Sequence, residues 1–327
     1  MDLRQLSAVT AVADHHSFSA AARALHTVQS NVSTHVARLE REVGASLVDR
    51  STGLLTEAGE IVVGRARRIQ GELDALVADV ASTLGEVSGP VRLGVIGTTG
   101  RWLLPKLFRH LAQAHPKVHL VVVDATTTSL IPQLVAGALD LAVVNLPITD
   151  PDVAVEILFE EDHVVLVPKG HPLANRTTIT IEDLSDVPLL LEPKGTGFRD
   201  DLEADAARSG VTLTPQAEVD GMRLLASIAA AGFGAAILPA SAIVTGSDGT
   251  WHTTPLRGTT PRTVGLATSR RARLAAPARA LVDVLHAVIL EEVPDQRGLH
   301  LPASAIVAGL PDGPLRSTLS ARPDANP

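Results

Sequence analysis

The stretch from Ser17 to Leu39 constrains this chain more than any other part of it. Its sequence, SFSAAARALHTVQSNVSTHVARL, predicts two short helices joined by a tight turn. Ser19 is the expected N-cap of the first helix, where the alanines favour helix and leave small faces for close packing. Thr27 is the expected cap of the second helix, whose apolar residues recur at steps of four, three and four: Val32, Val36, Leu39 and Val43. Such a stripe predicts that one face of the second helix is buried.

The opposite face of the second helix is polar. It carries mainly short hydrogen-bonding side chains: Gln29, Ser30, Asn31, Ser33, Thr34, His35 and Arg38. Amides and hydroxyls can hydrogen-bond to base edges in the DNA major groove, and Arg38 can reach a phosphate. With an amphipathic helix before it (Leu3 to Ala13), the pair predicts a helix-turn-helix unit. The alternative is an ordinary three-helix bundle with a solvated polar face.

Longer sequence motifs in the same region resemble those of a known protein family. The segments SFSAAARALH, QSNVS, RLEREVGASLVDR and LTEAG follow one another without a long gap between Met1 and Glu60. As a set they resemble the N-terminal domain of LysR-type transcriptional regulators, and the order of later segments extends the resemblance to about residue 292. The resemblance implies a winged helix-turn-helix domain over residues 1–57, with Arg50 and Thr52 of the wing loop added to the DNA-binding residues.

This sequence departs from the family pattern in three places. The family often has proline at the position of Ser30 and a basic residue at the position of Thr34. The wing loop RSTGLLT, residues 50–56, looks shorter than usual. We therefore expect the wing to make fewer groove contacts.

The charge of the chain is unusual for a protein that binds DNA. The whole chain has a formal net charge of −8. Residues 1–60 contain five arginines against seven carboxylates, a net charge of −2. A basic surface is the usual electrostatic signature of nucleic-acid binding. Affinity must therefore depend on local placement of Arg38, Arg50 and helix N-termini, and we expect weak nonspecific binding.

Residues 58–84 predict one long helix. Its apolar residues alternate at steps of four and three: Val62, Ala66, Ile69, Leu73, Leu76 and Val80. A stripe this narrow is typical of a two-stranded coiled coil. It predicts a homodimer through a linker helix, with a hinge at Gly85–Pro90, and the resemblance implies a tetramer. The alternative is an amphipathic helix folded back on its own domain.

From about residue 90 to residue 292 short apolar runs alternate with helical patterns. Strands are expected at 91–96, 118–123 and 139–144, separated by helices, and a second such set follows from 163 to 292. This pattern predicts an α/β fold with parallel sheets. Two lobes crossed by the chain resemble the effector domain of the LysR-type family, which is similar to periplasmic solute-binding proteins. Residues 293–327 are rich in Pro, Gly, Ser and Asp, and predict a disordered tail.

Loops after the carboxyl ends of the expected strands are the candidate effector site, because open α/β sheets bind ligands there. The candidates are Thr98, Thr99, Gly100, Arg101, Thr126, Thr127, Asn145, Thr196, Gly197 and Met222. Each loop alone is explained by a helix cap and a turn, and Arg101 could instead pair with an acid elsewhere. The resemblance places a small-molecule effector between the lobes, and hydroxyls at a helix N-terminus suit a small organic acid.

Composition excludes several other classes of protein. No run of about 18 apolar residues predicts a membrane span, and no signal pattern opens the chain, so we expect a cytoplasmic protein. The absence of cysteine excludes disulfides, thiolate zinc sites and thiol-based redox sensing. No dinucleotide, P-loop, serine-hydrolase or zinc-protease motif is present. The sequence therefore predicts a DNA-binding regulator without enzymatic activity, metal or cofactor. The rivals are a solute-binding domain with N-terminal oligomerisation helices and a DNA-binding regulator without ligand response.

Overall fold

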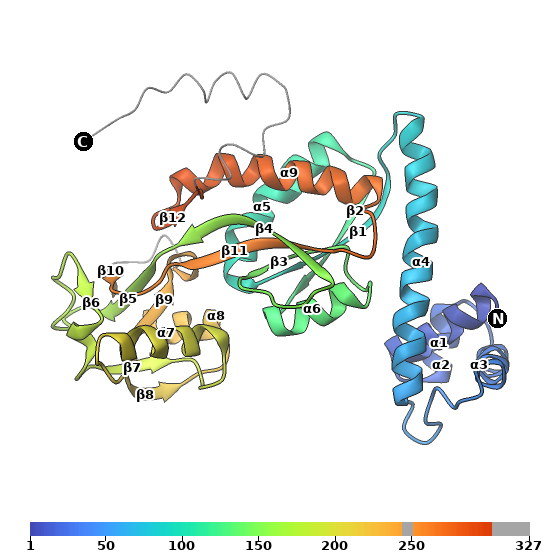
Figure 1. Cartoon of the computed structure of the whole chain (residues 1–327), viewed down its shortest axis with the longest axis horizontal. Helices are drawn as coiled ribbons and strands as arrows, with labels where there is room; N and C mark the ends of the chain where they lie inside the picture. The colour runs from blue at the N-terminus through green and yellow to red at the C-terminus, as the bar shows by residue number, and fades with distance from the viewer. Residues whose placement is uncertain (244–250, 303–327) are drawn as a thin grey trace.

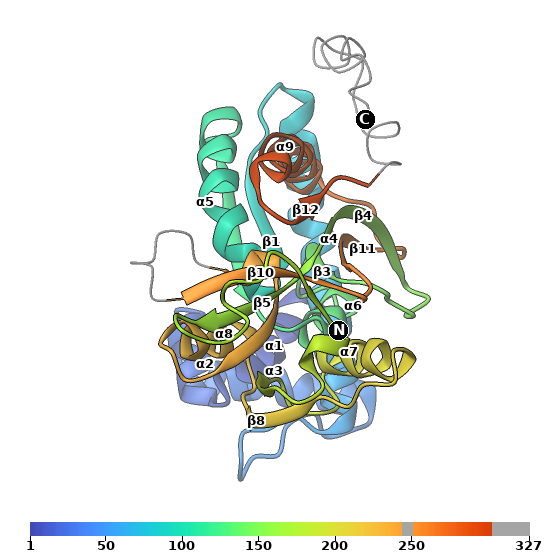
Figure 2. The same cartoon turned by 90° about the vertical axis from the view of Figure 1, so that its left-hand side faces the viewer.

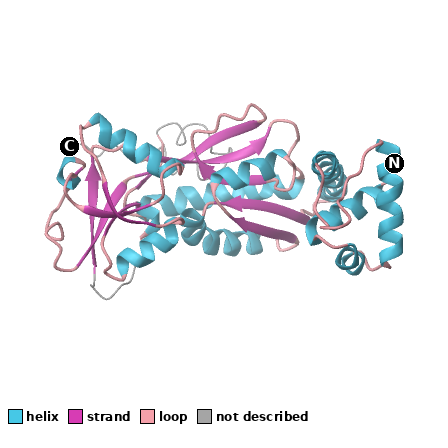
Figure 3. Ribbon diagram, turned by 90° about the horizontal axis from the view of Figure 1, so that it is seen from below, coloured by secondary structure: helices cyan, strands magenta, loops and turns pink. Residues whose placement is uncertain are grey.

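The computed structural model describes residues 1–243 and 251–302. Figure 1 shows a group of short helices at the N-terminus, one long helix, and two α/β lobes beyond it. Seen from below in Figure 3, the N-terminal helices occupy one end of the molecule and the lobes extend away from them. Within the described residues, no helix combines the length and apolar character needed to cross a membrane.

The N-terminal helices pack around the stripe predicted from the sequence. They are α1 (Leu3–His15), α2 (Phe18–Ala24) and α3 (Gln29–Val43). Val32, Val36 and Leu39 of α3 are at most 1 % exposed, and they pack against α1 and α2. The core is built almost entirely from valine, alanine and leucine, so close helix approach depends on small side chains such as Ala21.

Both predicted caps are wrong. Ser17, not Ser19, caps α2: its backbone is extended and its Oγ accepts a hydrogen bond from Ala20 N at 3.3 Å. Helix α3 begins after Val28, which makes no side-chain cap bond. Thr27 lies one residue too early to cap it, and its Oγ1 instead accepts from Asn31 Nδ2.

The long helix α4 (Glu57–Thr83) matches the predicted linker helix within one residue at each end. Thr56 caps it by accepting from Gly59 N at 3.0 Å. The apolar stripe divides into two parts. Val62 and Ala66 pack into the N-terminal core, whereas the four later positions are 36–62 % exposed: Ile69, Leu73, Leu76 and Val80.

The first lobe is a six-stranded mixed sheet in the order β12-β4-β11-β3-β1-β2. Its strands are β1 (Gly89–Val95), β2 (Val118–Asp124), β3 (Leu141–Asn145), β4 (Val153–Glu161), β11 (Arg262–Ser269) and β12 (Leu299–His300). Its helices are α5 (Gly97–Ala114), α6 (Thr127–Val135) and α9 (Ala276–Glu292). Figure 2 shows α5 and α9 above this sheet, where they contact each other.

The second lobe is a smaller mixed sheet in the order β6-β10-β5-β9-β7-β8. Its strands are β5 (His163–Pro168), β6 (Ile179–Thr180), β7 (Pro188–Leu191), β8 (Thr214–Glu218), β9 (Ala235–Pro239) and β10 (Trp251–Arg257). Its helices are α7 (Gly197–Arg208) and α8 (Met222–Ala230). The chain crosses between the lobes from β4 to β5 and again from β10 to β11.

Three expectations for the lobes are wrong. The sheets are mixed rather than parallel, because β11 runs antiparallel to β3 and β4, and β5 runs antiparallel to β9 and β10. The GTTG segment after β1 is the first turn of α5 and not a loop. The fold also continues past residue 293, since Leu299–His300 pairs with β4 and Val293 is fully buried. The rest of the predicted tail, 303–327, lies outside the described residues.

Two acidic residues join α4 to the first lobe: Asp74, whose Oδ2 lies 3.8 Å from Arg92 NH2 of β1, and Asp79. Asp79 Oδ1 accepts from Ala276 N at 2.9 Å, and so caps α9 from a different helix. The same oxygen pairs with Arg279 NH2 at 3.1 Å. The neighbouring Ala78 is 4 % exposed and packs beside Gly89 and Pro277. The C-terminal part of α4 is thereby docked on the effector lobe.

Candidate functional site

Helix α3 presents the polar face that the sequence predicts. Gln29, Ser30, Asn31, Thr34 and Arg38 are exposed, while Ser33 and His35 are half-buried. The Nδ1 atom of His35 is buried without a hydrogen-bond partner. The predicted DNA-binding residues of α3 therefore form one surface of short polar side chains, with a single arginine in the C-terminal half of the helix.

Several of these side chains are already held in place by neighbours. Ser19 Oγ donates to Gln29 Oε1 at 2.7 Å, which leaves the amide N–H groups of Gln29 available. Asn31 is bonded to Thr27, and Thr34 Oγ1 donates to Ser30 O at 2.8 Å. Fixed rotamers reduce the entropy lost when a side chain binds a base.

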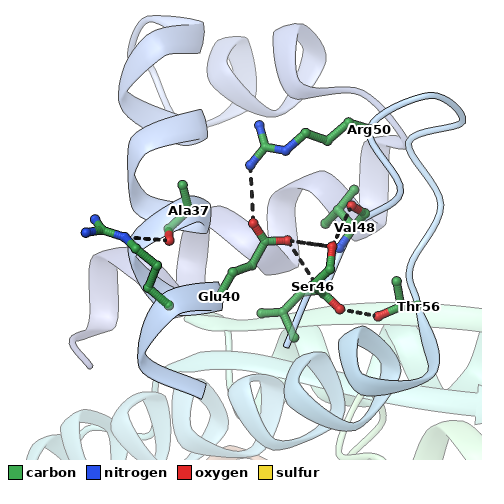
Figure 4. A network of polar contacts seen from close by, with 8 residues as sticks. Ala37, Glu40, Ser46, Val48, Arg50 and Thr56 are labelled. Atoms are coloured by element: carbon green, nitrogen blue, oxygen red, sulfur yellow. Dashed lines mark hydrogen bonds and ion pairs between the residues drawn. The ribbon is translucent and has the colours of Figure 1, made fainter. Parts of the chain in front are cut away.

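The wing is short and is anchored by Glu40 (Figure 4). It contains a single antiparallel bridge between Val48 and Leu55. Glu40 Oε1 accepts from Leu47 N at 2.8 Å, and Oε2 pairs with Arg50 NH2 at 3.2 Å. Burial raises the pKa of Glu40, but the Leu47 N–H and Arg50 outweigh it, so the pKa lies below its usual value.

This network changes the role expected of Arg50. Its guanidinium is paired with Glu40 and lies 5.4 Å from the centroid of the Phe18 ring. A phosphate contact through Arg50 would use the guanidinium N–H groups that Glu40 leaves free or compete with Glu40 for the guanidinium. Thr52, the other wing candidate, is exposed. Arg38 is exposed and forms no ion pair among the described residues, so it is the candidate best placed to meet a phosphate.

The effector candidates on the first lobe lie at the carboxyl ends of its parallel strands. Thr98 and Thr99, in the first turn of α5, are 4 % and 0 % exposed. Thr98 Oγ1 accepts from Arg262 NH2 at 2.9 Å, whereas Thr99 Oγ1 is buried without a partner. Thr127 Oγ1 accepts from Asn145 N at 3.0 Å, so the start of α6 contacts the end of β3.

Two of the first-lobe candidates have structural roles. A Cβ on Gly100 would lie 3.1 Å from Val95 Cγ1, so this glycine allows α5 to pack closely on β1. Arg101 donates to the backbone carbonyls of Ser241 and Ile243, at 2.9 and 3.0 Å. Arg101 therefore ties α5 to the segment after β9, and it forms no ion pair with an acid among the residues that the structure describes. The exposed Thr126 caps α6 with its backbone, and its hydroxyl bonds to Thr128 and Ser129.

The second-lobe candidates begin helices α7 and α8. Thr196 is the N-cap of α7, and its Oγ1 donates to Pro193 O at 3.0 Å. Gly197 is exposed and Met222 is half-buried. Among the described residues, no hydrogen bond or ion pair joins Thr196, Gly197 or Met222 to the first lobe.

Sequence reasoning missed the charged groups at the crossover between the lobes. Glu161, 0 % exposed, accepts from Arg262 Nε at 2.6 Å and from Ser241 N at 3.0 Å. His163 is 4 % exposed and has no partner on either ring nitrogen. Burial and then Arg262 lower the pKa of His163 to about 4. These residues lie on β4, β5 and β11, of which only β5 and β11 were expected as strands.

A further ion pair at the crossover joins the two lobes directly. Arg223 NH2 of α8 lies 2.6 Å from Asp124 Oδ2 at the end of β2. A hydrophobic pattern does not reveal such a pair, because its partners are about 100 residues apart in the sequence. The described residues contain no group of three or more histidines and carboxylates arranged to bind a metal ion.

Comparison with known proteins identifies the family. The LysR substrate-binding domain matches residues 84–289, and the helix-turn-helix domain of bacterial regulatory proteins of the lysR family matches residues 3–60. The chain belongs to the LysR family. As a LysR-family protein it is a DNA-binding transcriptional regulator with an effector-binding domain, as the sequence predicts.

The relatives and structures similar to this LysR-family chain include proteins named OxyR. The DNA-binding transcriptional dual regulator OxyR of Escherichia coli K12 is 31 % identical over 296 residues, which cover 86 % of this chain and 96 % of the relative. A hydrogen peroxide-inducible genes activator of Dickeya chrysanthemi is 32 % identical over 247 residues, 74 % of this chain and 80 % of the relative.

A solved structure extends this similarity to three dimensions. It is full-length OxyR from Pseudomonas aeruginosa with one cysteine replaced by aspartate. Its TM-score is 0.70 at 28 % identity, covering 88 % of this chain and 94 % of that chain.

Proposed function

We propose that this chain is a homodimer, assembled further into a tetramer, that binds promoter DNA through α3 and responds to a small organic acid held between its lobes. It would act in the cytoplasm and carry no catalytic activity. Residues 1–57 would bind DNA, 58–89 would form the dimerisation helix and hinge, and 90–292 would bind the effector. The observation that carries the proposal is the exposed polar face of α3 above a fully buried apolar face.

DNA contacts are assigned to the exposed face of α3 and to the wing. Gln29, Ser30, Asn31, Ser33 and Thr34 would meet base edges in the major groove, and Arg38 would meet a phosphate. His35 is half-buried and would contact DNA from the edge of the exposed face of α3. Arg50 and Thr52 would contact the backbone from the wing.

The proposed effector differs in kind from hydrogen peroxide, for which the Dickeya relative, a hydrogen peroxide-inducible genes activator, is named. The 327 residues of this chain include no cysteine. Oxidation of a cysteine thiolate to sulfenic acid or disulfide therefore has no site in it. A buried, unpartnered Thr99 hydroxyl beside the N-terminus of α5 instead supports binding of an anionic molecule.

The dimer is supported by the exposed half of the α4 stripe. Ile69, Leu73, Leu76 and Val80 line a groove on α4 that also contains Arg65 and Asp79. Four consecutive apolar stripe positions exposed on one helix face are typical of a coiled-coil seam before it is paired. A second copy of α4 would cover them.

The test of DNA recognition uses Gln29→Ala. A target duplex is first selected from random sequences with the wild-type protein, and binding is measured by fluorescence anisotropy. Loss of the Gln29 amide should weaken binding to the selected duplex by about 1–3 kcal/mol and relax the preference at one base pair. Arg41→Ala is the matched control, because Arg41 is exposed on the same helix and bonds only to Ala37 O. Unchanged affinity and selectivity of Gln29→Ala would contradict the assignment of α3.

A further inference from the structure

The ion pair between Arg223 and Asp124 bridges the two lobes. Asp124 ends β2 in the first lobe, and Arg223 is the second residue of α8 in the second lobe. Their nearest atoms, Arg223 NH2 and Asp124 Oδ2, are 2.6 Å apart. The Arg223 side chain is 56 % exposed and that of Asp124 is 39 % exposed. Both groups are therefore accessible from solvent and can exchange partners.

The pair lies directly in front of the N-terminus of α5. A Cβ on Gly97, the first residue of α5, would be 2.8 Å from Arg223 Nε and 2.9 Å from Asp124 Oδ1. A larger residue at this point would force the side chains of Arg223 and Asp124 to shift. The ion pair therefore lies beside the first turn of an 18-residue helix, whose first N–H groups have no acceptor within the helix.

Three guanidinium groups, of Arg101, Arg223 and Arg262, lie around this helix end. Within the described part of the chain Arg101 bonds to backbone carbonyl groups, and burial and then Arg223 lower its pKa. Arg262 is neutralised by Glu161. Arg223 is paired with Asp124 and remains 56 % exposed, so an anion at the positive end of the α5 dipole would meet an accessible guanidinium.

A hydroxyl in the same turn lacks a partner. Thr99 is 0 % exposed, and its Oγ1 forms no hydrogen bond. A buried hydroxyl without a partner is rare in folded proteins, because leaving it unpaired costs about 1–3 kcal/mol. A ligand oxygen at the N-terminus of α5 would provide that partner.

We propose that Arg223 determines the selectivity of the effector site for a carboxylate. Asp124 holds the guanidinium in front of α5 when the site is empty. An effector carboxylate takes the place of Asp124 on Arg223 and accepts hydrogen bonds from the first turn of α5. This inference rests on the proposed function, since it concerns the effector site of a LysR-family regulator, and it adds the residue that recognises the anionic group.

The test depends on two variants with opposite effects. Succinate and benzoate serve as probes, with succinamide and benzamide as their neutral counterparts, and binding to the full-length protein is measured by calorimetry. Arg223→Gln removes the cation and should weaken binding of the tighter of the two anions about tenfold or more. Asp124→Asn removes the competing carboxylate and should strengthen binding of the same anion roughly threefold. General damage to the fold would weaken binding in both variants.

A matched control and a direct readout of the lobes complete the test. Arg271→Gln alters another half-exposed arginine, paired with Asp152 in the first lobe, and should leave anion binding unchanged. Because the chain has no cysteine, Ala112→Cys and Ala204→Cys place spin labels only on exposed faces of α5 and α7. The distance between these labels should become more widely distributed in Arg223→Gln than in Arg271→Gln.

Three results would overturn the inference. These are equal binding of the neutral amides, weaker anion binding by Asp124→Asn, and no binding of either anion by the wild-type protein. In each case the same preparation is tested on the selected DNA duplex. Retention of DNA binding would leave the proposed regulator function intact, whereas loss of DNA binding by the folded wild-type protein would count against that function itself.

Discussion

Replacing His163 with leucine should make the stability of the second lobe less sensitive to acid. The His163 ring is 4 % exposed, lies edge-on to Phe198 at 5.2 Å between centroids, and has no hydrogen-bond partner on either nitrogen. Burial and Arg262 lower its pKa from 6.5 to about 4, while Glu161, Asp162 and Asp205 act in the opposite direction. The folded protein therefore keeps His163 neutral in a range of pH where an unfolded chain protonates it.

The sign and magnitude of the change in stability with pH follow from this difference in the pKa of His163. Between pH 6.5 and pH 4 the unfolded chain binds more protons than the folded chain at this residue, so stability falls as the pH falls. A difference from 6.5 to about 4 corresponds to roughly 3 kcal/mol when the pH is below both values. At pH 5 the loss is about 2 kcal/mol, and near pH 7.5 it is close to zero.

Urea unfolding at pH 7.5 and pH 5 measures the effect. The chain has two tryptophans, Trp102 in the first lobe and Trp251 in the second. In a Trp102→Phe background, the fluorescence of Trp251 reports the lobe that contains His163. Between pH 7.5 and pH 5, the free energy of unfolding should fall by about 2 kcal/mol more in the parent than in its His163→Leu variant.

A control separates His163 from other titrating groups. His252→Leu changes an exposed histidine on β10, the strand paired with β5, and should keep the acid sensitivity of the parent. The reasoning would be refuted if His163→Leu and the parent lost the same stability between pH 7.5 and pH 5. A larger loss in the variant would mean that His163 is charged in the folded protein.

Three further predictions concern other parts of the chain. Glu40→Gln should release Arg50 and destabilise the N-terminal domain by about 1–2 kcal/mol. The dependence of DNA affinity on salt concentration should steepen by about one phosphate contact, and an unchanged dependence would show that Arg50 stays away from DNA. Leu76→Glu should abolish dimers in sedimentation velocity, because the charge would be buried against a second α4, while Val77→Glu, equally exposed but outside the groove, should leave them intact. Thr99→Val should raise the thermal midpoint of unfolding slightly and weaken binding of the same anionic probe by about 1–3 kcal/mol; a lower midpoint would argue against an unpaired hydroxyl.

The elements of this fold with a clear hydrophobic period could be predicted from the sequence. The stripe of α3 and the length of α4 follow from steps of three and four residues, and both agree with the structure. The parallel strands β1, β2 and β3 follow from short apolar runs between helices. In these cases one buried face is enough to define the element.

The missed elements lack such a signal. Strand β4 has three exposed residues in succession, Val155 to Ile157, where the register against β11 shifts, so its apolar residues do not alternate. Strand β10 contains Thr253 and Pro255, and its apolar positions are few. Antiparallel pairing with distant strands stabilises both, and a local pattern carries no information about those partners.

The candidate sites divide in the same way. The exposed face of α3 could be derived from helical periodicity alone, because burial of one side fixes the other. In the cleft, the sequence indicated the strand ends but not which side chains point inward or meet across the lobes. Arg101 and Arg223 both occur near helix N-termini, yet the first bonds to carbonyls and the second to Asp124. That distinction depends on contacts more than 80 residues apart.

The contact between Asp79 and the N-terminus of α9 turns α4 into a lever. From Asp79 to Glu57 the helix spans 22 residue steps, about 33 Å at a rise of 1.5 Å per residue. A rotation of about 6° of the first lobe around this joint would displace the far end of α4 by roughly 3.4 Å, the rise of one base pair. The helices α1 to α3 are packed on that far end through Val63 and Ala66. A change of a few degrees in lobe orientation is therefore large enough to shift α3 along DNA by about one base-pair step.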